Sequence, residues 1–344
     1  IEKAQAMRAN RYTAARTLLC LAVARNDVLA AIAYGSARAD WTDRHQVVTS
    51  LKALVDPADT TSFPGMTGPA GESFLEAVDE HSWPARLGLT KYPLNTRLLL
   101  ADDGSMVAAE VGEAQAVPVV AGNWTSTTLT PRKFSAITVI SDELARASSP
   151  AAAGAISDAL ARAVASAENR SFLSRGETGS VFSGQVTLSG SGSSLAQVDA
   201  DLAALVDAVP NAHLGGVFAM GKSTARFLSQ LRGSGGALAF PTMALSDARL
   251  FGLDVIVDDA MASAGSPNLR HIGLISPAEI VYGSDGGVEL STSKAAALKL
   301  DDAPTASADA LYSLFQMNAT GIKGARWSAW YARPNAAATL SVEF

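Results

Sequence analysis

The longest regular hydrophobic pattern in the chain lies between Pro150 and Leu173. Apolar side chains recur there at helical spacing, at Ile156, Leu160, Val164 and Ala167. Ser149 is placed to cap the N-terminus of this helix, and Pro150 falls in its first turn. Gly176 follows the last apolar position. At 1.5 Å per residue the predicted helix is roughly 35 Å long, which is unusual for a globular protein.

Strand patterns come before this helix. Leu94–Ala101 reads as a strand, Asp102-Asp103-Gly104 as a tight turn and Met106–Val111 as a returning strand. This hairpin has little apolar alternation to hold it on its own core, so we expect residues 94–122 to project outward. The segment Trp124–Ile140 is again strand-like and rich in threonine.

After Leu195 helices and strands alternate, which predicts a compact α/β or α+β unit. The expected helices are 195–209, which ends at Pro210, and 223–231, and the expected strands are 216–220, 253–257, 272–275 and 280–282. The apolar and aromatic stretch Leu311–Ala332 is expected to return to the sheet that residues 125–140 begin.

The N-terminal segment differs from the rest in charge. Residues 1–52 contain eight basic and four acidic side chains, whereas the whole chain has a formal net charge of -6. Leu18–Ala24 and the stretch beginning near Thr42 read as helices, and turn-rich residues 56–73 read as an extended connector. Two interpretations stay open: a solvated helical face, or a basic arm that docks on acidic neighbours.

Composition narrows the class of protein. Of the 344 residues, 48% are hydrophobic and 17% are charged, which predicts a globular protein of two or three domains. The acidic total argues against a chain that binds nucleic acid over its whole surface. Leu18–Ala24 follows basic residues as in a signal peptide, but it stops at Arg25, far short of the ~20 residues of a spanning helix.

One motif points to an enzyme. Gly216-Val217-Phe218-Ala219-Met220-Gly221-Lys222-Ser223 matches the phosphate-loop pattern, and Asp258-Asp259 follows a strand where a magnesium ligand is expected. That loop needs a strand before its first glycine, yet Pro210–Gly215 reads as a turn. Residues 217–220 read better as the strand itself. A P-loop nucleotide-binding protein therefore remains the alternative function.

No other catalytic or metal-binding set emerges. Cys20 is the single cysteine, so the chain has no intrachain disulfide and no cysteine-based zinc site. The four histidines are far apart in sequence, at positions 45, 81, 213 and 271. Adjacent acids at 258–259 and 301–302 are more typical of solvated strand ends than of a cation site. We expect no cofactor, no metal and no enzymatic activity.

Taken in order, these segments resemble the major capsid protein of tailed bacteriophages, the Hong Kong 97 (HK97-like) fold. The segments that carry the resemblance are Phe134–Leu144 leading into a spine helix, Ser149–Leu173 with Gly176, Gly216–Met220 with Leu250–Val257, and Phe315–Arg326. The resemblance implies an α+β fold. Its parts would be an N-terminal arm at 1–70, a peripheral domain at 71–93 and 123–192 with the spine helix, an extended β-hairpin loop at 94–122, an axial α/β domain at 193–300, and a peripheral return strand at 301–344.

The resemblance also implies a function. Identical subunits would form hexamers and pentamers of an icosahedral head shell in the virion, assembled in the host bacterial cytoplasm. Double-stranded DNA would be held weakly inside. A portal, a scaffold or protease and decoration proteins are the other expected partners, and no membrane is involved. The chain begins with Ile1 rather than Met, which fits the family's removal of an N-terminal segment and fits a shortened sequence equally well.

Some family members join subunits through a lysine in the extended loop. Residues 94–122 contain no lysine, and Lys91 and Lys133 only flank them. We therefore expect a shell held by non-covalent contacts of the loop and the arm. The expected contacts join charged residues of the loop to basic residues of the next subunit's peripheral domain: Arg97, Asp102, Asp103, Glu110 and Glu113 on the loop, and Arg132 and Lys133 on the peripheral domain. A monomeric binding module is the third class, although it leaves the projecting segments unexplained.

Overall fold

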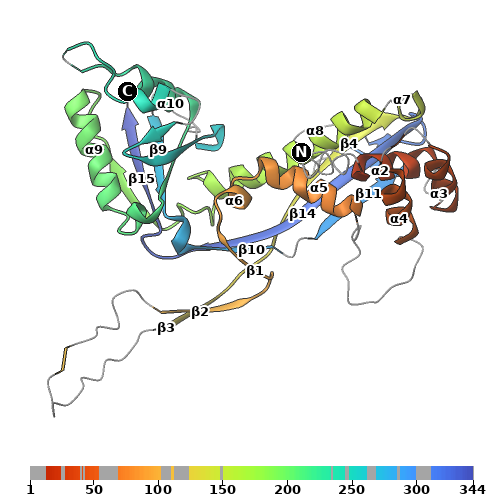
Figure 1. Cartoon of the computed structure of the whole chain (residues 1–344), viewed down its shortest axis with the longest axis horizontal. Helices are drawn as coiled ribbons and strands as arrows, with labels where there is room; N and C mark the ends of the chain where they lie inside the picture. The colour runs from red at the N-terminus through yellow and green to blue at the C-terminus, as the bar shows by residue number, and fades with distance from the viewer. Residues whose placement is uncertain are drawn as a thin grey trace.

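The chain folds into an elongated molecule with a helical cluster at one end, an α/β unit at the other and a long helix between them (Figure 1). The computed structural model describes residues 13–24, 28–38, 41, 43–53, 69–101, 110–111, 124–147, 150–233, 235–244, 248–261, 269–284, 287–299 and 311–343. The long helix is α8, Pro150–Leu173, with the bounds expected from its cap and its apolar spacing.

The middle of the molecule is a mixed sheet beneath α8. Its order is β1-β10-β14-β11, and β4 pairs with β14. The strands are β1 Thr90–Tyr92, β4 Arg132–Ser141, β10 Ile280–Gly283, β11 Val288–Ser293 and β14 Ala319–Ala332. β4 and β14 run antiparallel from Ala319↔Ser141 to Ser328↔Arg132. The predicted return of 311–332 to the sheet of 125–140 is therefore confirmed.

Helices pack closely on one face of this sheet because a glycine lies at the contact. α5, Pro69–His81, and α8 meet β14 at Gly324, where a Cβ atom would lie 2.9 Å from Phe74 Cζ and 3.0 Å from Leu160 Cδ2. Both side chains are buried. The missing side chain therefore sets how near the helices come to the strand.

The N-terminal residues form three helices that pack on their own subunit: α2 Thr13–Val23, α3 Val28–Ala37 and α4 Arg44–Ala53. Leu18, Leu19 and Cys20 share one core with Phe74 and Leu160. Asp43 is buried, where it pairs with Arg16 and accepts a hydrogen bond from Thr13 Oγ1 at 2.9 Å. An arm that leaves the subunit is thus wrong for the described residues 13–53, because their apolar faces complete the subunit's own core.

The α/β unit is a six-stranded sheet in the order β5-β15-β9-β6-β8-β7. Its strands are β5 Val186–Ser189, β6 Val217–Met220, β7 Arg249–Leu250, β8 Leu253–Val257, β9 Leu269–Ile275 and β15 Ala337–Glu343. α9, Leu195–Asp207, and α10, Lys222–Gln230, cover one face over a core that includes Phe218, Met220 and Leu340. Phe172, at the end of α8, packs on the other face with Ala219 and Ile256.

Short elements join these layers. They are α6 Trp83–Arg86, α7 Asp142–Ala147, β12 Ala297–Leu298 with β13 Tyr312–Ser313, and the 3-10 helices η1 Ala212–Leu214, η2 Pro241–Ala244, η3 Asp259–Met261 and η4 Pro277–Glu279. Trp83 Nε1 donates to Asp258 Oδ2 at 2.6 Å, which links α6 to the end of β8.

The projecting ribbon pairs two segments that lie more than twenty residues apart in the chain. β2, Arg97–Ala101, pairs with β3, Trp124–Thr128, in the antiparallel register Arg97↔Thr128 to Ala101↔Trp124. The threonine-rich β-branched segment thus supplies a strand partner for β2. Of the expected return strand Met106–Val111, residues 106–109 lie outside the described residues, and 110–111 are not in a strand. The expected turn at Asp102-Asp103-Gly104 lies outside the described residues.

Two of the domain boundaries expected from the sequence differ in the structure. β10 and β11 lie within 193–300, yet both pair with β14 in the sheet under α8. β15 lies within 301–344, yet it pairs with β9 and β5 in the α/β sheet. The chain crosses between the two sheets twice near its end, and local hydrophobic pattern carries no information about which sheet a strand joins.

Candidate interaction surfaces

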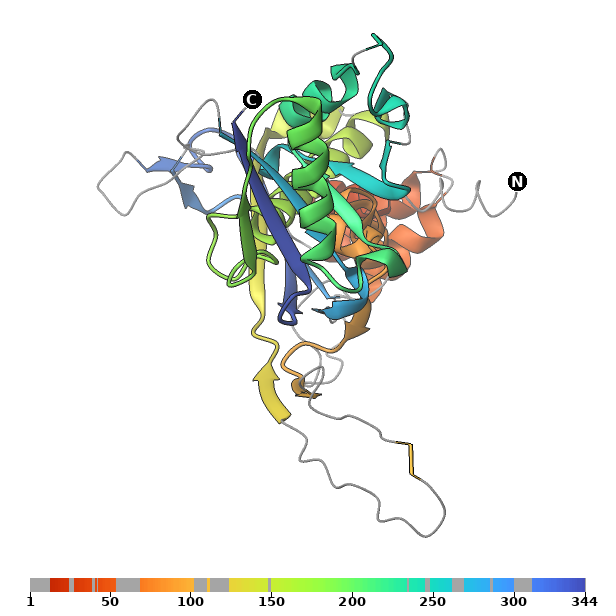
Figure 2. The same ribbon diagram turned by 90° about the vertical axis from the view of Figure 1, so that its left-hand side faces the viewer.

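The β2–β3 ribbon points away from the body of the molecule (Figures 1 and 2). Leu98 and Leu129 anchor its base against Val281 and Ala329. Arg97 is exposed on the ribbon, and its Nη2 donates to Ser126 Oγ at 3.2 Å. A two-stranded ribbon is at best marginally stable by itself in water. Its outer edges have no strand partner among the described residues.

The structure describes few of the ribbon acids that the sequence singled out. Glu110 is exposed. Asp102, Asp103 and Glu113 lie outside the described residues.

The open face of the middle sheet carries a small charged cluster. Glu289 on β11 binds two lysines: Lys133 Nζ at 2.7 Å and Lys323 Nζ at 3.1 Å. Hydrogen bonds from Lys133, and then from Lys323, lower the pKa of Glu289. One carboxylate thus serves two ammonium groups, which leaves one positive charge in surplus. Lys133 also lies over the Trp327 ring, 5.2 Å from its centroid.

Sequence reasoning missed Lys323 and Glu289. They are far from Lys133 along the chain, and only the pairing of β4 and β11 with β14 brings the three together. The signal that was present is alternation: on β14, Lys323 and Trp327 fall on the same side of the strand, opposite to that of Gly324.

Arg132 lies on the other face of the sheet from Lys133, because successive strand residues point to opposite faces. Its Nη1 donates to Ser171 Oγ at 3.3 Å, and its guanidinium lies over the Trp330 ring, 4.9 Å from the centroid. The structure thus separates the two basic residues that the sequence grouped. Arg132 joins the end of α8 to β14, and Lys133 faces outward.

A buried ion cluster lies where α5 and α8 meet the sheet. Arg326 is 1% exposed, Glu168 0% and Tyr282 0%. Arg326 Nη2 lies 2.7 Å from Asp79 Oδ1, and Arg326 Nη1 lies 3.4 Å from Glu168 Oε2. Tyr282 accepts from Arg326 at 2.8 Å and donates to Glu168 at 3.0 Å. Burial, and then the charge of Glu168, raise the pKa of Tyr282, so its hydroxyl stays protonated and available to donate.

The literal phosphate-loop motif does not form a phosphate loop. Residues 217–220 are β6, whose backbone groups pair with β8 and β9 instead of facing an empty site. Phe218, Ala219 and Met220 are buried. Gly221 caps α10, and Lys222 Nζ binds Asp259 Oδ2 at 2.7 Å on the surface. The strand interpretation of residues 217–220 is confirmed, and nothing in this geometry supports the nucleotide-binding alternative.

The remaining candidate chemical groups are structural. Cys20 is buried, and desolvation raises the pKa of its thiol to about 12. His271 is buried beside Arg175 and Ser341, and burial followed by the charge of Arg175 lowers its pKa. Over the described part of the chain, no group of three or more His, Cys, Asp or Glu side chains is placed to hold a metal ion.

Among the described helices, none alone has both the length and the hydropathy that crossing a membrane requires. Arg16–Val23 and Val28–Ala37, a pair bent by 120°, meet the two criteria only when taken together.

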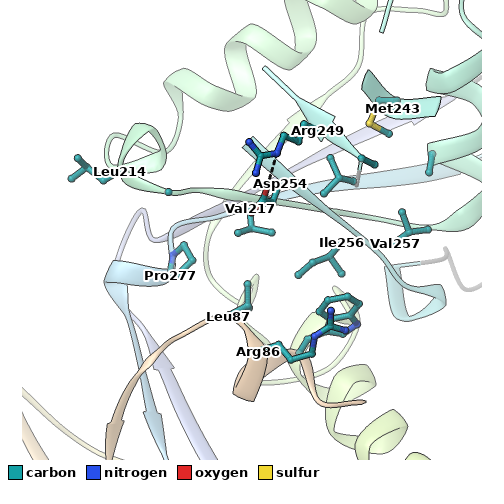
Figure 3. Close-up of a pocket in the computed structure, with 15 residues that line it drawn as sticks. Arg86, Leu87, Leu214, Val217, Met243, Arg249, Asp254, Ile256, Val257 and Pro277 are labelled. Carbon is teal, nitrogen blue, oxygen red and sulfur yellow. Dashed lines mark ion pairs between the residues drawn. The ribbon is translucent and has the colours of Figure 1, made fainter. Parts of the chain in front are cut away.

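An open groove runs along β8 at the edge of the α/β sheet (Figure 3). Its volume is about 1140 Å³. Figure 3 shows Leu214, Val217 and Ile256 on one side, with Leu87 and Arg86 of the α6 region facing them. Arg249 and Asp254 form an ion pair at 3.1 Å across the β7–β8 turn. The lining combines apolar side chains with polar surface, and it holds no cluster of catalytic groups.

An exposed apolar surface lies around β13. Phe315 is 79% exposed and Leu311 is 65% exposed, and Tyr312 and Met317 are also exposed. Large side chains exposed together are typical of contact surfaces. The molecule thus combines a projecting ribbon with an open groove and an exposed apolar surface, and the described residues contain no catalytic arrangement.

Comparison with known proteins agrees with this combination. Residues 90–338 match the phage capsid family. The capsid polyprotein of Pseudomonas phage PAJU2 is 30% identical over an alignment of 348 residues. The alignment covers 93% of this chain and 52% of that protein. The chain therefore spans about half the length of this relative.

Solved structures share the fold. One from Gordonia phage Cozz has a TM-score of 0.56 at 14% identity, over 76% of this chain and 87% of that one. The capsid of an empty GTA particle has a TM-score of 0.55 at 13% identity, over 85% of this chain and 97% of that one.

The α+β architecture of spine helix, extended ribbon and end α/β unit is that of the Hong Kong 97 class of capsid proteins. The chain belongs to the phage capsid family. It is thus a capsid protein, of the class whose members build the shell of the phage head. This membership accounts for the projecting ribbon, which a monomeric binding module leaves without a role.

Proposed function

We propose that this chain is the major capsid protein of a phage head, and that its copies form hexamers and pentamers of an icosahedral shell around double-stranded DNA. The observation that carries the proposal is the β2–β3 ribbon, which leaves the subunit with edges that no described strand covers. A second copy completes such edges at little cost in ordering, because the base of the ribbon is already anchored.

The ribbon lies over the next subunit's open sheet face. Asp102, Asp103, Glu110 and Glu113 carry its negative charge against the single positive charge of Arg97. Lys133 and Lys323 share Glu289 and offer a surplus positive charge to those acids. Arg132 contributes less than the sequence suggested, since its guanidinium is held against Trp330 within its own subunit.

The shell is held by non-covalent contacts. Residues 94–122 contain no lysine to form a cross-link between subunits. The same modest contact recurs many times in a closed shell, which makes the whole particle durable. The role is structural rather than enzymatic, and assembly takes place in the host bacterial cytoplasm without a membrane.

Other partners follow from the same role. The acidic net charge of -6 suits a container whose packaged DNA is held weakly and released readily. A portal, a scaffold or protease and decoration proteins are the further partners that a head shell needs for filling, maturation and reinforcement.

Negative-stain microscopy and sedimentation of the purified chain test the proposal. Closed shells, or rings of five and six copies, are the expected result. Heating such particles in detergent should give a single monomer band on a gel, because no covalent bond joins the subunits. A concentrated sample that sediments only as monomers contradicts the shell, and a ladder of cross-linked bands contradicts the non-covalent contact.

A further inference from the structure

The α/β unit meets the C-terminal end of α8 at β9, against which the segment after the helix packs. Phe182 of this segment lies so close to β9 that a Cβ atom at Gly273 would overlap its ring. Arg175, near the start of the same segment, lies beside His271 of β9. His271 and Gly273 share one side of the strand, because side chains two residues apart point the same way. The segment thus makes one apolar and one polar contact with β9.

The polar contact requires a neutral histidine. Arg175 Nη1 lies 2.9 Å from Ser341 Oγ and 3.4 Å from His271 Nδ1, and Ser341 is the partner of His271 in the ladder of β15 and β9. A guanidinium group can only donate, so the Nδ1 atom that faces it has to accept, as it does in the neutral imidazole with its proton on Nε2. His271 is 8% exposed, so little water reaches this contact.

The charged groups on the elements around β9 decide how this contact responds to pH. They are Arg175 and Glu177 after α8, Arg270 on β9, Glu343 on β15, Lys222 and Arg226 on α10, and Asp258 and Asp259 after β8. Asp259 pairs with Lys222 at 2.7 Å, and Arg270 lies over the Phe227 ring, 5.6 Å from its centroid. Burial, and then the charge of Arg175, lower the pKa of His271, so the described acids do not offset these two effects.

We propose that neutral His271 latches the α/β unit to the end of α8, and that protonation of His271 opens this latch and lets the α/β unit move relative to α8. In the closed state a protonated imidazole would place a second positive charge 3.4 Å from Arg175 Nη1, and its Nδ1–H would face a donor. The latch lies within one subunit, so it goes beyond the proposed shell and does not depend on it.

The direction of the pH effect follows from the two states. In the open state the imidazole of His271 is in water and takes up a proton near its ordinary pKa of 6.5, whereas in the closed state its pKa is lower. The open state therefore binds more protons below that pH. The closed state loses stability relative to the open state as the pH falls below about 6.5, and it keeps its full stability above that value.

A second contact joins the same two parts without a histidine. Trp83 of α6 receives a hydrogen bond at each end: its backbone N–H donates to Asn169 Oδ1 of α8 at 2.8 Å, and its Nε1 donates to Asp258 Oδ2 after β8 at 2.6 Å. This contact keeps the α/β unit attached when the His271 latch opens. Acid should therefore loosen the joint locally and leave the rest of the subunit folded.

Hydrogen exchange tests the latch in the full chain, kept dilute enough to remain as single subunits, at about pH 7.5 and about pH 5.5. After correction for intrinsic exchange rates, the backbone amides of residues 174–185 should lose protection by at least about fivefold at the lower pH. The amides of α2 and α5, in the helical cluster, should keep theirs. Protection that is retained in 174–185 at the lower pH, or lost equally over the whole chain, overturns the latch.

Substitutions separate the protonation of His271 from its packing. H271Q stays neutral at both pH values, so its loss of protection should shrink to less than about twofold. H271K is charged at both, so residues 174–185 should be weakly protected already at the higher pH. H213Q is the matched control, because it makes the same change at an exposed histidine of the same unit, and it should behave as the original chain does.

R175M tests the other side of the latch. It removes the second positive charge, so the pH-dependent loss of protection should be smaller than in the original chain. Circular dichroism checks that each variant is folded, and R175M carries the test if H271Q is not. A loss in H271Q or in R175M as large as that of the original chain overturns the proposal, because the loss then has a cause other than the charge on His271 beside Arg175.

Discussion

Arg326 brings together carboxylates from two helices at one point of the central strand. Asp79 comes from α5 and Glu168 from α8, and both ion pairs end on the guanidinium of Arg326. Such a buried set adds little net stability over an apolar core, but it is costly to break, because the remaining charge is left without a partner. Its physical role here is to fix how the two helices sit on β14.

Removing Arg326 alone should therefore destabilise the subunit strongly. R326M leaves Glu168 buried without its cation, and we expect the free energy of unfolding to fall by about 3–5 kcal/mol. Urea denaturation of unassembled subunits, followed by circular dichroism, measures this loss. The double variant R326M/E168Q should lose less than R326M, and R97M on the exposed ribbon should change little. An R326M midpoint equal to that of the original chain would show that the cluster does not hold the helices.

The burial of Cys20 predicts that the subunit loses stability at alkaline pH. Burial raises the pKa of its thiol from 9.0 to about 12. Between those values the native thiol keeps its proton while the unfolded thiol loses it. The unfolded state then binds fewer protons, so the free energy of unfolding is unaffected below pH 9 and falls as the pH rises toward 12.

Urea midpoints near pH 8 and near pH 10.5 measure this effect, and C20A should show a smaller alkaline loss than the original chain. At the lower pH a thiol reagent should react with Cys20 only after denaturation. Rapid reaction in the native subunit would contradict its burial.

At the scale of elements, the sequence predicted a helix or strand correctly where the interactions that form it lie within a few residues. The cap, the first-turn proline and the apolar spacing of α8 act within the helix, and the observed bounds Pro150–Leu173 agree with them. The pairing of β2 with β3 depends on which distant segment comes alongside, and the sequence pattern did not indicate it. The same holds for the charged cluster on the open sheet face. The sequence indicated Lys133, but it did not indicate Glu289 and Lys323, because only strand pairing brings them beside it.

The contact between α8 and the sheet depends on a missing side chain at Gly324. In G324V the Cβ atom would lie 2.9 Å from Phe74 Cζ, so the helices must move away from β14. We expect overpacking to lower the free energy of unfolding by about 1–3 kcal/mol. Thermal unfolding of G324V checks this, and G287A is the matched control, because nothing lies within 4 Å of its new Cβ atom. Equal midpoints for the two variants would contradict the close packing.

At the scale of the whole molecule, the surfaces that matter are those that one subunit leaves incomplete. The ribbon, the open sheet face and the two edges of the α/β sheet lie on different sides of the body (Figures 1 and 2). Assembly therefore depends on many weak, partly electrostatic contacts, and it should respond to salt.

Salt and the charge of the open sheet face should shift assembly in defined directions. Raising the salt from about 0.1 M to about 1 M shortens the Debye length from about 10 Å to about 3 Å, so more protein should be needed for shells. K133Q/K323Q should raise that concentration at low salt, because the ribbon acids lose their partners. E289Q should lower it, because both lysines become available.

Light scattering across a protein dilution series gives these concentrations. Assembly that is equally efficient at both salt levels would contradict the electrostatic contact of the ribbon. Shifts of K133Q/K323Q and E289Q in the same direction would contradict its assignment to this sheet face.

The sequence by itself located α8, α9, α10 and several strands, because caps, turns and apolar spacing act over a few residues, and the order of these segments indicated the class of the protein. It missed α3 and α5, and the connector expected at 56–73 is helical from Pro69 on. It also indicated that residues 217–220 are a strand, in spite of the phosphate-loop motif. Only the tertiary structure decided that helices α2, α3 and α4 complete the subunit's own core, that β15 joins the α/β sheet, and that Arg132 and Lys133 face opposite ways. These outcomes depend on contacts between segments far apart in the chain, which no local pattern encodes.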